Sequence, residues 1–197
     1  MAAEPGNRRP VLVPMANLAG LPLKIRDGLF RVVVETPKGA TQKIDYDDEL
    51  ECFFVKRRLP LGIAYPFHFG FFPSTRGEDG DPVDAIVLYD QPAFPGLVLA
   101  CRIVGALRVA QTEEGKTVRN DRFIVVPKSD MEHVSVADVQ DLSADRRAEI
   151  EAFLTQSVRL ERKALSFLGW SDRAAAERML LASSPAKKAA SRGPKNG

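Results

Sequence analysis

The sequence predicts an α+β protein that is mainly β, with its strands first and its helices last. Short runs of β-branched and aromatic residues, separated by Gly and Pro, occupy the chain from about residue 30 to residue 126. Such runs are typical of a small β-barrel or sandwich. Apolar residues recur at helical spacing near the C-terminus, which indicates amphipathic helices. Strands followed by helices favour α+β over an alternating α/β fold.

Six strands are expected in the β part. The first, over residues 30–35, is rich in valine and ends before Pro37. The aromatic-rich stretch over 65–72 is bounded by Pro66 and Pro73 and resembles packed core more than a binding surface. The remaining strands are expected over 52–55, 83–89, 97–109 and 123–126, the last of them ending before Pro127. Residues that favour turns separate these runs, which is typical of short strands.

Two helices are expected after the strands. Ser143 can cap the first helix, because its side chain can accept a hydrogen bond from a free backbone N–H. Asp145 then lies in the first turn, where the helix dipole favours an acid. Ile150, Phe153, Leu154 and Val158 form one apolar face. The last helix is expected to start at 171–172 and to continue through Leu180.

One folded domain with two tails is expected. The chain has 197 residues, of which 45% are hydrophobic, enough for one substantial core. We expect an N-terminal arm over residues 1–20, the domain over 21–183 and a disordered basic tail over 184–197. The tail takes four of the 28 basic residues and none of the 26 acidic ones, so the remainder carries −2. A broad nucleic-acid-binding face is therefore not expected.

The composition favours a cytoplasmic protein. Cys52 and Cys101 both lie in apolar runs, and we expect buried, reduced thiols instead of a disulfide framework. No apolar run approaches the ~20 residues of a membrane span. Arg8 and Arg9 precede a short apolar run that faintly resembles a signal peptide, but Pro14 interrupts it, so export is not expected.

The most informative stretch is the acidic turn Asp79-Gly80-Asp81-Pro82-Val83-Asp84. Three carboxylates within six residues suit a hard cation, Mg²⁺ or alternatively Mn²⁺. A solvated Asp-rich turn is the plainer interpretation. An EF-hand is excluded, because Val83 and Asp84 stand where its loop needs an oxygen ligand and a glycine. Zinc is not expected, because neither histidine has ligand spacing from a cysteine.

Other polar residues occur in an order that suits phosphate. Glu35 ends a strand and is followed by Lys43 and Asp45, and Arg57 and Tyr65 come next. Lysine and arginine bring fixed positive charge to phosphate oxygens, and a tyrosine hydroxyl is a donor. Each residue alone is weak evidence, since most exposed lysines and arginines are solvated surface. Together they predict a phosphate-binding cleft.

This order resembles the soluble, Mg²⁺-dependent inorganic pyrophosphatases. The turn fits the whole of their signature, D-x-D-P-x-D, and the resemblance extends from about residue 21 to residue 170. It also includes Val34-Glu35-Thr36-Pro37, Arg57, Tyr65-Pro66, Phe69-Gly70-Phe71, Pro95-Gly96 and Gly105. The resemblance implies an OB-like five-stranded β-barrel with flanking C-terminal helices, pyrophosphate as the substrate, and a homo-oligomer. The charge and the lack of a long apolar run separately predict no nucleic-acid partner and no membrane partner.

The resemblance also implies roles for individual residues. Asp79 and Asp84 correspond to metal ligands, and Asp81 to the acid that activates the attacking water. Glu35 and Asp45 correspond to further acids that order metals and water. Lys43, Arg57 and Tyr65 correspond to phosphate holders. The implied reaction is direct phosphoryl transfer to water that bound metal ions activate.

The chain departs from the family's pattern on one side of the expected site. Gln111 and Asn120 stand where the family has Asp, and Arg122 stands where it has Lys, so Arg122 is a candidate phosphate holder. Asp121 is a candidate replacement ligand, although a one-residue shift in a strand points a side chain to the opposite face. Glu113 and Glu114 are alternative sources of a carboxylate.

A second group of departures falls near the penultimate helix. Ser157 and Val158 stand where the family has a Tyr-Lys pair, and Phe69 stands where it has a Tyr. The candidate replacements for the lost lysine are Arg159, Arg162 and Lys163. Three hypotheses follow: an active pyrophosphatase, a catalytically impaired or repurposed member that binds a phosphorylated ligand or a protein, and an unrelated OB-like binding module.

Overall fold

The computed structural model describes residues 17–130, 135–159, 161 and 163–184. Most of the expected N-terminal arm and nearly all of the expected basic tail lie outside the described residues. The same is true of the Arg8-Arg9 pair and of Arg162.

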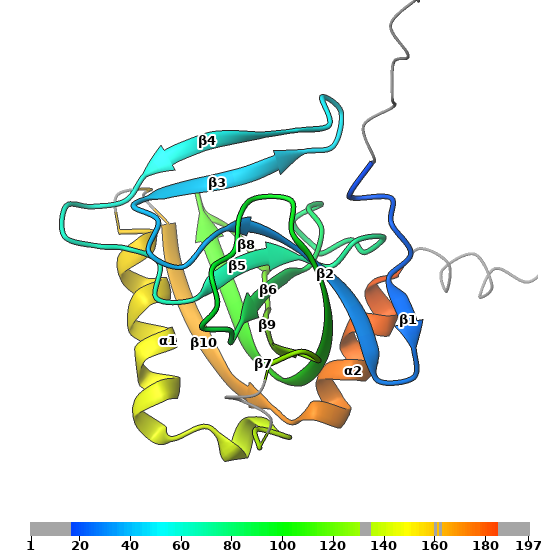
Figure 1. Cartoon of the computed structure of the whole chain (residues 1–197). Helices are drawn as coiled ribbons and strands as arrows, with labels where there is room; N and C mark the ends of the chain where they lie inside the picture. The colour runs from blue at the N-terminus through cyan, green and yellow to red at the C-terminus, as the bar shows by residue number, and fades with distance from the viewer. Residues whose placement is uncertain (1–16, 131–134, 160, 162, 185–197) are drawn as a thin grey trace, which may run out of the picture.

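Five strands close into a ring. They are β2 (Leu29–Thr36), β5 (His68–Phe71), β6 (Asp84–Val87), β9 (Arg122–Pro127) and β7 (Val98–Glu113). They pair in that order, and β7 pairs back with β2, while β6 and β9 are the parallel pair. This ring confirms the expected five-stranded barrel (Figure 1).

The other strands extend the barrel or lie apart from it. β1 (Lys24–Arg26) pairs with β2, and β8 (Lys116–Arg119) pairs with β7. β3 (Gln42–Asp47) and β4 (Cys52–Arg58) form a separate hairpin. Figure 1 shows this hairpin lying across one end of the barrel.

The expected helices are present, with one strand between them. η1 (Val139–Asp141) precedes α1 (Ala144–Ser157), which Ser143 caps by accepting from the Arg146 N–H at 3.1 Å. α2 (Arg173–Ser183) starts after Asp172, which accepts from the Ala175 N–H at 2.7 Å. Val158 was expected inside the first helix, but it is the residue that ends it.

The strand β10 (Lys163–Ser171) was not predicted from the sequence. It follows α1 closely and pairs antiparallel with β7 from Lys163↔Glu113 to Ser171↔Ala106. Its side chains alternate between half-buried and exposed over most of its length, which is the period of a strand with one covered face. The short strands β1, β3 and β8 were also missed, and β5 is shorter than expected, because residues 65–67 approach it as loop.

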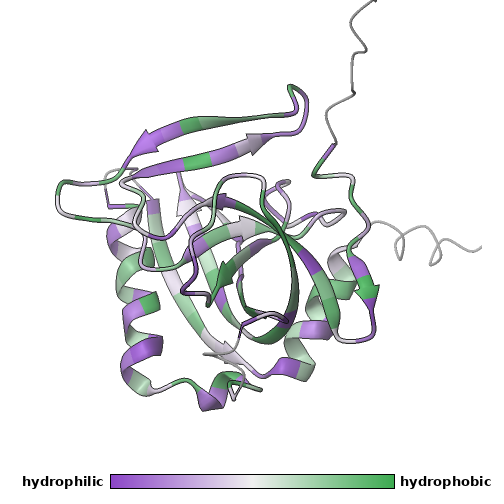
Figure 2. Cartoon of the chain, in the orientation of Figure 1, coloured by the Kyte–Doolittle hydropathy of each residue, from purple (hydrophilic) through white to green (hydrophobic). Residues whose placement is uncertain are grey.

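Two cores fill the molecule. Alternation along β6 sends Ala85 and Val87 into the core that α2 covers, and Ile86 into the core that α1 covers. Both faces of this strand are therefore buried, which explains its continuous apolar sequence. Figure 2 shows hydrophobic residues along the barrel strands and hydrophilic residues mixed with them over the β3–β4 hairpin.

The barrel requires two glycines for close approach. A Cβ at Gly70 would lie 1.9 Å from the Val33 carbonyl oxygen, where β5 crosses β2. A Cβ at Gly105 would lie 2.5 Å from a Val139 side-chain atom, at the bulge of β7. Both distances are too short for any side chain.

The structure also describes the two cysteines and the lengths of the helices. Both cysteines are free, and Cys101 is buried as expected, but Cys52 is only half-buried. No helix among the described residues is long and apolar enough to cross a membrane.

Candidate active site

A cleft of about 780 Å³ lies where the β3–β4 hairpin, the barrel and the C-terminal end of α1 meet. Most of the polar residues that the sequence singles out line it. From the acidic set these are Glu35, Asp45, Asp79, Asp81 and Asp84, and from the basic and hydroxyl set they are Lys43, Arg57, Tyr65 and Arg122.

The acidic turn lies between β5 and β6. Gly80 has a φ of +95°, a conformation that glycine adopts without strain, and the Gly77 N–H donates to the Asp81 carbonyl at 2.8 Å. Asp84 opens β6 and forms an ion pair with Arg122. Burial raises the pKa of Asp79 above its ordinary value, and the negative charges of Asp84 and Asp81 raise it further. The three carboxylates therefore repel one another, and a bound cation would relieve that repulsion.

Glu35 and Asp45 add two carboxylates from β2 and β3. Glu35 accepts from the Tyr46 N–H at 2.8 Å. Burial raises the pKa of Glu35 to about 8, with a smaller contribution in the same direction from the charge of Asp45. Burial alone would also raise the pKa of Asp45, but Lys43 and Lys56 outweigh it and hold this pKa below its ordinary value.

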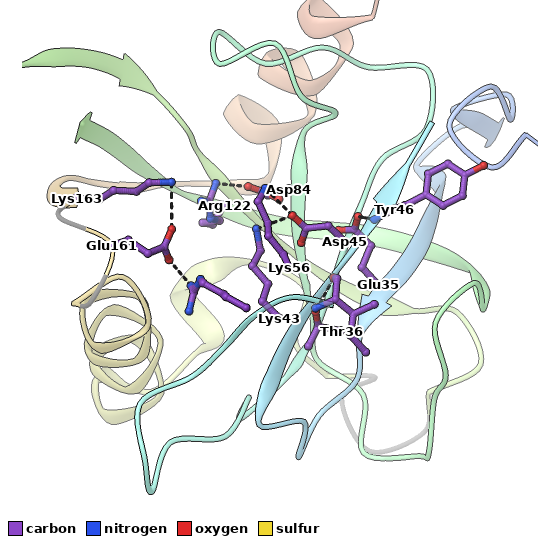
Figure 3. Close-up of polar contacts among 12 residues, drawn as sticks. Glu35, Thr36, Lys43, Asp45, Tyr46, Lys56, Asp84, Arg122, Glu161 and Lys163 are labelled. Atoms are coloured by element: carbon purple, nitrogen blue, oxygen red, sulfur yellow. Dashed lines mark hydrogen bonds and ion pairs between the residues drawn. The ribbon is translucent and has the colours of Figure 1, made fainter. Parts of the chain in front are cut away.

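The contacts of Asp45 are one-sided. Its Oδ2 lies 2.7 Å from Lys56 Nζ and 3.1 Å from Lys43 Nζ. Its Oδ1 is buried and has no hydrogen-bond partner in the structure. Figure 3 shows both lysines directed at this carboxylate. A buried carboxylate oxygen without a partner is costly, so Asp45 has one oxygen suited to a cation.

The basic residues form a second group. Arg57 forms an ion pair with Glu161, whose other oxygen lies 3.1 Å from Lys163 Nζ. Lys163 Nζ also lies 3.3 Å from a Glu113 oxygen, and Figure 3 shows the link from Lys163 to Glu161. The Nε of Arg57 is buried and has no hydrogen-bond partner among the described residues. This donor is suited to an anion that enters the cleft.

Tyr65 lines the cleft as a nearly buried residue. It is 4% exposed, and its ring packs against Phe69 and Phe153, each with its ring centre 5.0 Å away. Burial raises the pKa of the Tyr65 phenol, and Asp45 and Asp84 act in the same direction. The phenol therefore stays neutral and remains able to donate a hydrogen bond.

Asp121 does not line the cleft, and neither do the alternative candidates Glu114 and Arg159. The two oxygens of Asp121 each lie 2.8 Å from Arg119 Nη2, and its Oδ1 accepts from the Val109 N–H at 2.9 Å. Neighbouring residues of an extended segment point to opposite sides, and here Asn120 is the neighbour that lines the cleft. Asp121 is thus used to hold β7 and the segment before β9 together.

The positions that depart from the family's pattern do lie in the cleft. Gln111 and Glu113 reach it from β7, and Ser157 and Val158 reach it from the end of α1. The Ser157 hydroxyl donates to the Leu154 carbonyl at 2.9 Å, so it is already used within the helix. Lys163 lines the same wall.

Sequence reasoning missed Lys56 and Glu161. Lys56 lies two residues after Phe54, which is the cross-strand partner of Asp45. The register shifts between the pairs Lys43↔Arg57 and Ile44↔Val55, which leaves Lys56 as the extra residue of β4. Strict alternation would send Lys56 and Arg57 to opposite faces, but at this bulge both line the cleft, and no pattern in the sequence marks the bulge. Glu161 lies between α1 and the unpredicted β10, and no pattern in the sequence marks it.

Among the described residues, no three Asp, Glu, His or Cys side chains converge as a preformed metal-binding group. Mg²⁺ usually takes only one or two protein carboxylates and completes its shell with water and phosphate oxygens. The Asp79–Asp84 turn and the free oxygen of Asp45 fit such an ion.

Comparisons with known proteins agree with this geometry. A family model described as inorganic pyrophosphatase matches residues 32–187. The inorganic pyrophosphatase of a Synechocystis species is 35% identical over 156 residues, which cover 79% of this chain and 90% of that relative.

The chain belongs to the inorganic pyrophosphatase family.

A crystal structure of inorganic pyrophosphatase from Thermus thermophilus extends the likeness to three dimensions. It is similar at a TM-score of 0.80 and 33% identity, covering 88% of this chain and 99% of that one. The Thermus thermophilus relative is 35% identical over 166 residues, 82% of this chain and 93% of its own length. Family membership and the OB-like barrel expected from the sequence are both confirmed.

Proposed function

We propose that this chain hydrolyses inorganic pyrophosphate to two phosphates. The observation that carries the proposal is the pairing of two unsatisfied groups in one cleft: Asp45 Oδ1, suited to a cation, and Arg57 Nε, suited to an anion. A magnesium pyrophosphate complex has both charges. The names of the matching relatives support the same substrate.

The carboxylates on the acidic side have two roles in this proposal. Asp79, Asp84 and Asp45 hold Mg²⁺, with Mn²⁺ as an alternative. When bound, the divalent cation lowers the pKa of water and polarises phosphate oxygens. Asp81 lies between Asp79 and Asp84 in the turn and takes the proton from the attacking water. Glu35 orders that water from the end of β2.

The basic side holds the substrate. Lys43 and Arg57 are cross-strand partners in the hairpin, so both can reach one phosphate group. They neutralise charge that grows on the leaving phosphate, and the neutral Tyr65 hydroxyl donates to it. Arg122 forms an ion pair with Asp84 and lines the same cleft, so it can also contact phosphate. Lys163 adds a further positive charge from β10. No observation favours a role in binding alone.

The direct experiment is phosphate release from pyrophosphate across a Mg²⁺ titration, with ATP as a second substrate. We expect saturable release from pyrophosphate, dependence on the cation and little release from ATP. Absence of release at every Mg²⁺ and Mn²⁺ concentration would show that the proposed activity is wrong.

Two further proposals concern the whole protein. We infer a cytoplasmic location, which two free cysteines support. We also infer a homo-oligomer, because large apolar side chains such as Leu50 (73% exposed) and Phe94 (62% exposed) lie on the surface. Light scattering in solution measures the assembly, and a monomer at micromolar concentration would contradict it.

A further inference from the structure

Lys56 is a cleft residue to which neither the family signature nor the proposed reaction assigns a role. It lies on β4, and its ammonium group is 2.7 Å from Asp45 Oδ2. Lys43 contacts the same oxygen from 3.1 Å. Figure 3 shows the two lysines meeting at this one carboxylate.

This arrangement places two positive charges on one negative charge. The Asp45 side chain is 13% exposed, so water screens the contact only partly. The Lys56 side chain is 46% exposed, so its ammonium can leave the cleft at low cost. Lys43 is less exposed, at 35%, and it is the lysine that the family pattern assigns to phosphate. Of the two lysines, Lys56 is therefore the more readily displaced.

The contacts of Asp45 also show what Lys56 opposes. Both lysines contact Oδ2, while the buried Oδ1 has no hydrogen-bond partner in the part of the chain that the structure describes. A divalent cation that approaches Oδ1 meets a positive charge already held at the same carboxylate. The repulsion between them weakens binding unless the lysine withdraws.

We propose that Lys56 sets the affinity of the cleft for its divalent cation, by acting as an internal competitor at Asp45. This inference rests on the proposed function only in taking the cleft to be a cation site. Lys56 is a positioning residue in this proposal, because it changes cation binding through its contact with Asp45 and does not itself touch the cation.

The test is calorimetric titration of Mg²⁺ into the full chain without substrate. Replacing Lys56 by Gln removes the competing charge, and we expect the dissociation constant for Mg²⁺ to fall on the order of tenfold. Lys56→Arg keeps the charge and should bind Mg²⁺ as the unaltered chain does. Thermal unfolding of each variant checks that the fold is intact.

Lys38 offers a matched control. Its side chain is also 46% exposed and forms a similar ion pair, 2.6 Å from Asp90 Oδ1, but it does not line the cleft. Lys38→Gln should leave Mg²⁺ binding unchanged. An equal gain in Mg²⁺ affinity in both Gln variants would show that the effect comes from the net charge of the protein, and it would overturn the proposal.

One further outcome would also overturn it, namely a Lys56→Gln variant that binds Mg²⁺ within twofold of the unaltered chain or more weakly. If the KM of that variant for pyrophosphate is raised as well, Lys56 is a phosphate holder. Because the titration needs no turnover, failure of the hydrolysis assay would count against the proposed function and not against this inference.

Discussion

The two walls of the cleft differ in how the chain builds them. The acidic wall centres on one turn, in which Asp79, Asp81 and Asp84 lie within six residues. The opposite wall combines Arg57 from β4, Glu161 from the segment after α1 and Lys163 from β10. One wall is local in sequence, whereas the other exists only after the barrel has closed.

The charges of the two walls differ in the same way. In the acidic wall, like charges repel, and the pKa of Asp79 is raised by burial and by its neighbours. In the opposite wall, ion pairs with Glu161 and Glu113 already balance Arg57 and Lys163. We infer that the acidic wall depends on a ligand for its neutrality, while the opposite wall can stand without one.

The largest expected effect concerns Asp81, the proposed base in the acidic wall. Asp81→Asn keeps the shape of the side chain but removes this proposed base, so kcat should fall by about 10²–10⁴. The fold and Mg²⁺ binding should persist, because Asp79 and Asp84 are unchanged. Phosphate-release assays measure the loss, and circular dichroism follows the fold.

Asp27 provides the control for that experiment. It lies in the β1–β2 turn outside the cleft lining and pairs only with the exposed Lys24, at 2.6 Å, among the described contacts. Asp27→Asn should retain full activity. Normal turnover in Asp81→Asn would remove Asp81 from the mechanism.

A smaller effect is expected when the opposite wall is weakened. Lys163→Gln removes one cation from the Glu161 cluster, and KM for pyrophosphate should rise about fivefold to tenfold, with kcat nearly unchanged. Steady-state kinetics at saturating Mg²⁺ separate the two constants. Lys24→Gln, an exposed lysine outside the cleft lining, is the control. An unaltered KM in Lys163→Gln would show that this wall does not contact the substrate.

The contrast between the walls also explains what the sequence could predict. Asp79, Asp81 and Asp84 form a short motif, and their arrangement follows from one turn. The approximate positions of the six expected strands and of the two capped helices were likewise predictable, because periodicity and capping are local signals. These features needed no knowledge of distant contacts.

The missed features depend on long-range pairing. β10 is a strand only because β7 offers it an edge, and Glu161 reaches Arg57 only because β10 follows α1. Lys56 was hidden for a related reason, since its face depends on the β3–β4 hairpin. Asp121 was a candidate ligand because it is adjacent to Asn120 in the sequence. The sequence does not reveal that Arg119 and the Val109 N–H already bind its carboxylate.

The smallest expected effect is on stability and concerns Glu35 in the acidic wall. Its pKa is raised from an ordinary 4.5 to about 8, chiefly by burial. Between these values the folded chain keeps a proton that the unfolded chain has lost. The contribution of this proton to the free energy of unfolding is fully present below pH 4.5 and is lost as pH rises through about 8. Without divalent cations, the melting temperature should therefore fall across this range.

Glu35→Gln isolates this contribution, because glutamine can still accept from the Tyr46 N–H and does not titrate. The difference in melting temperature between this variant and the unaltered chain should change by roughly 3 °C or more from pH 5 to pH 8.5. Glu149→Gln, on the exposed face of α1, should show no such change. Equal pH profiles for Glu35→Gln and the unaltered chain would mean that Glu35 is ionised throughout this range. The acidic wall would then tolerate its full negative charge without a cation, and the contrast between the two walls would disappear.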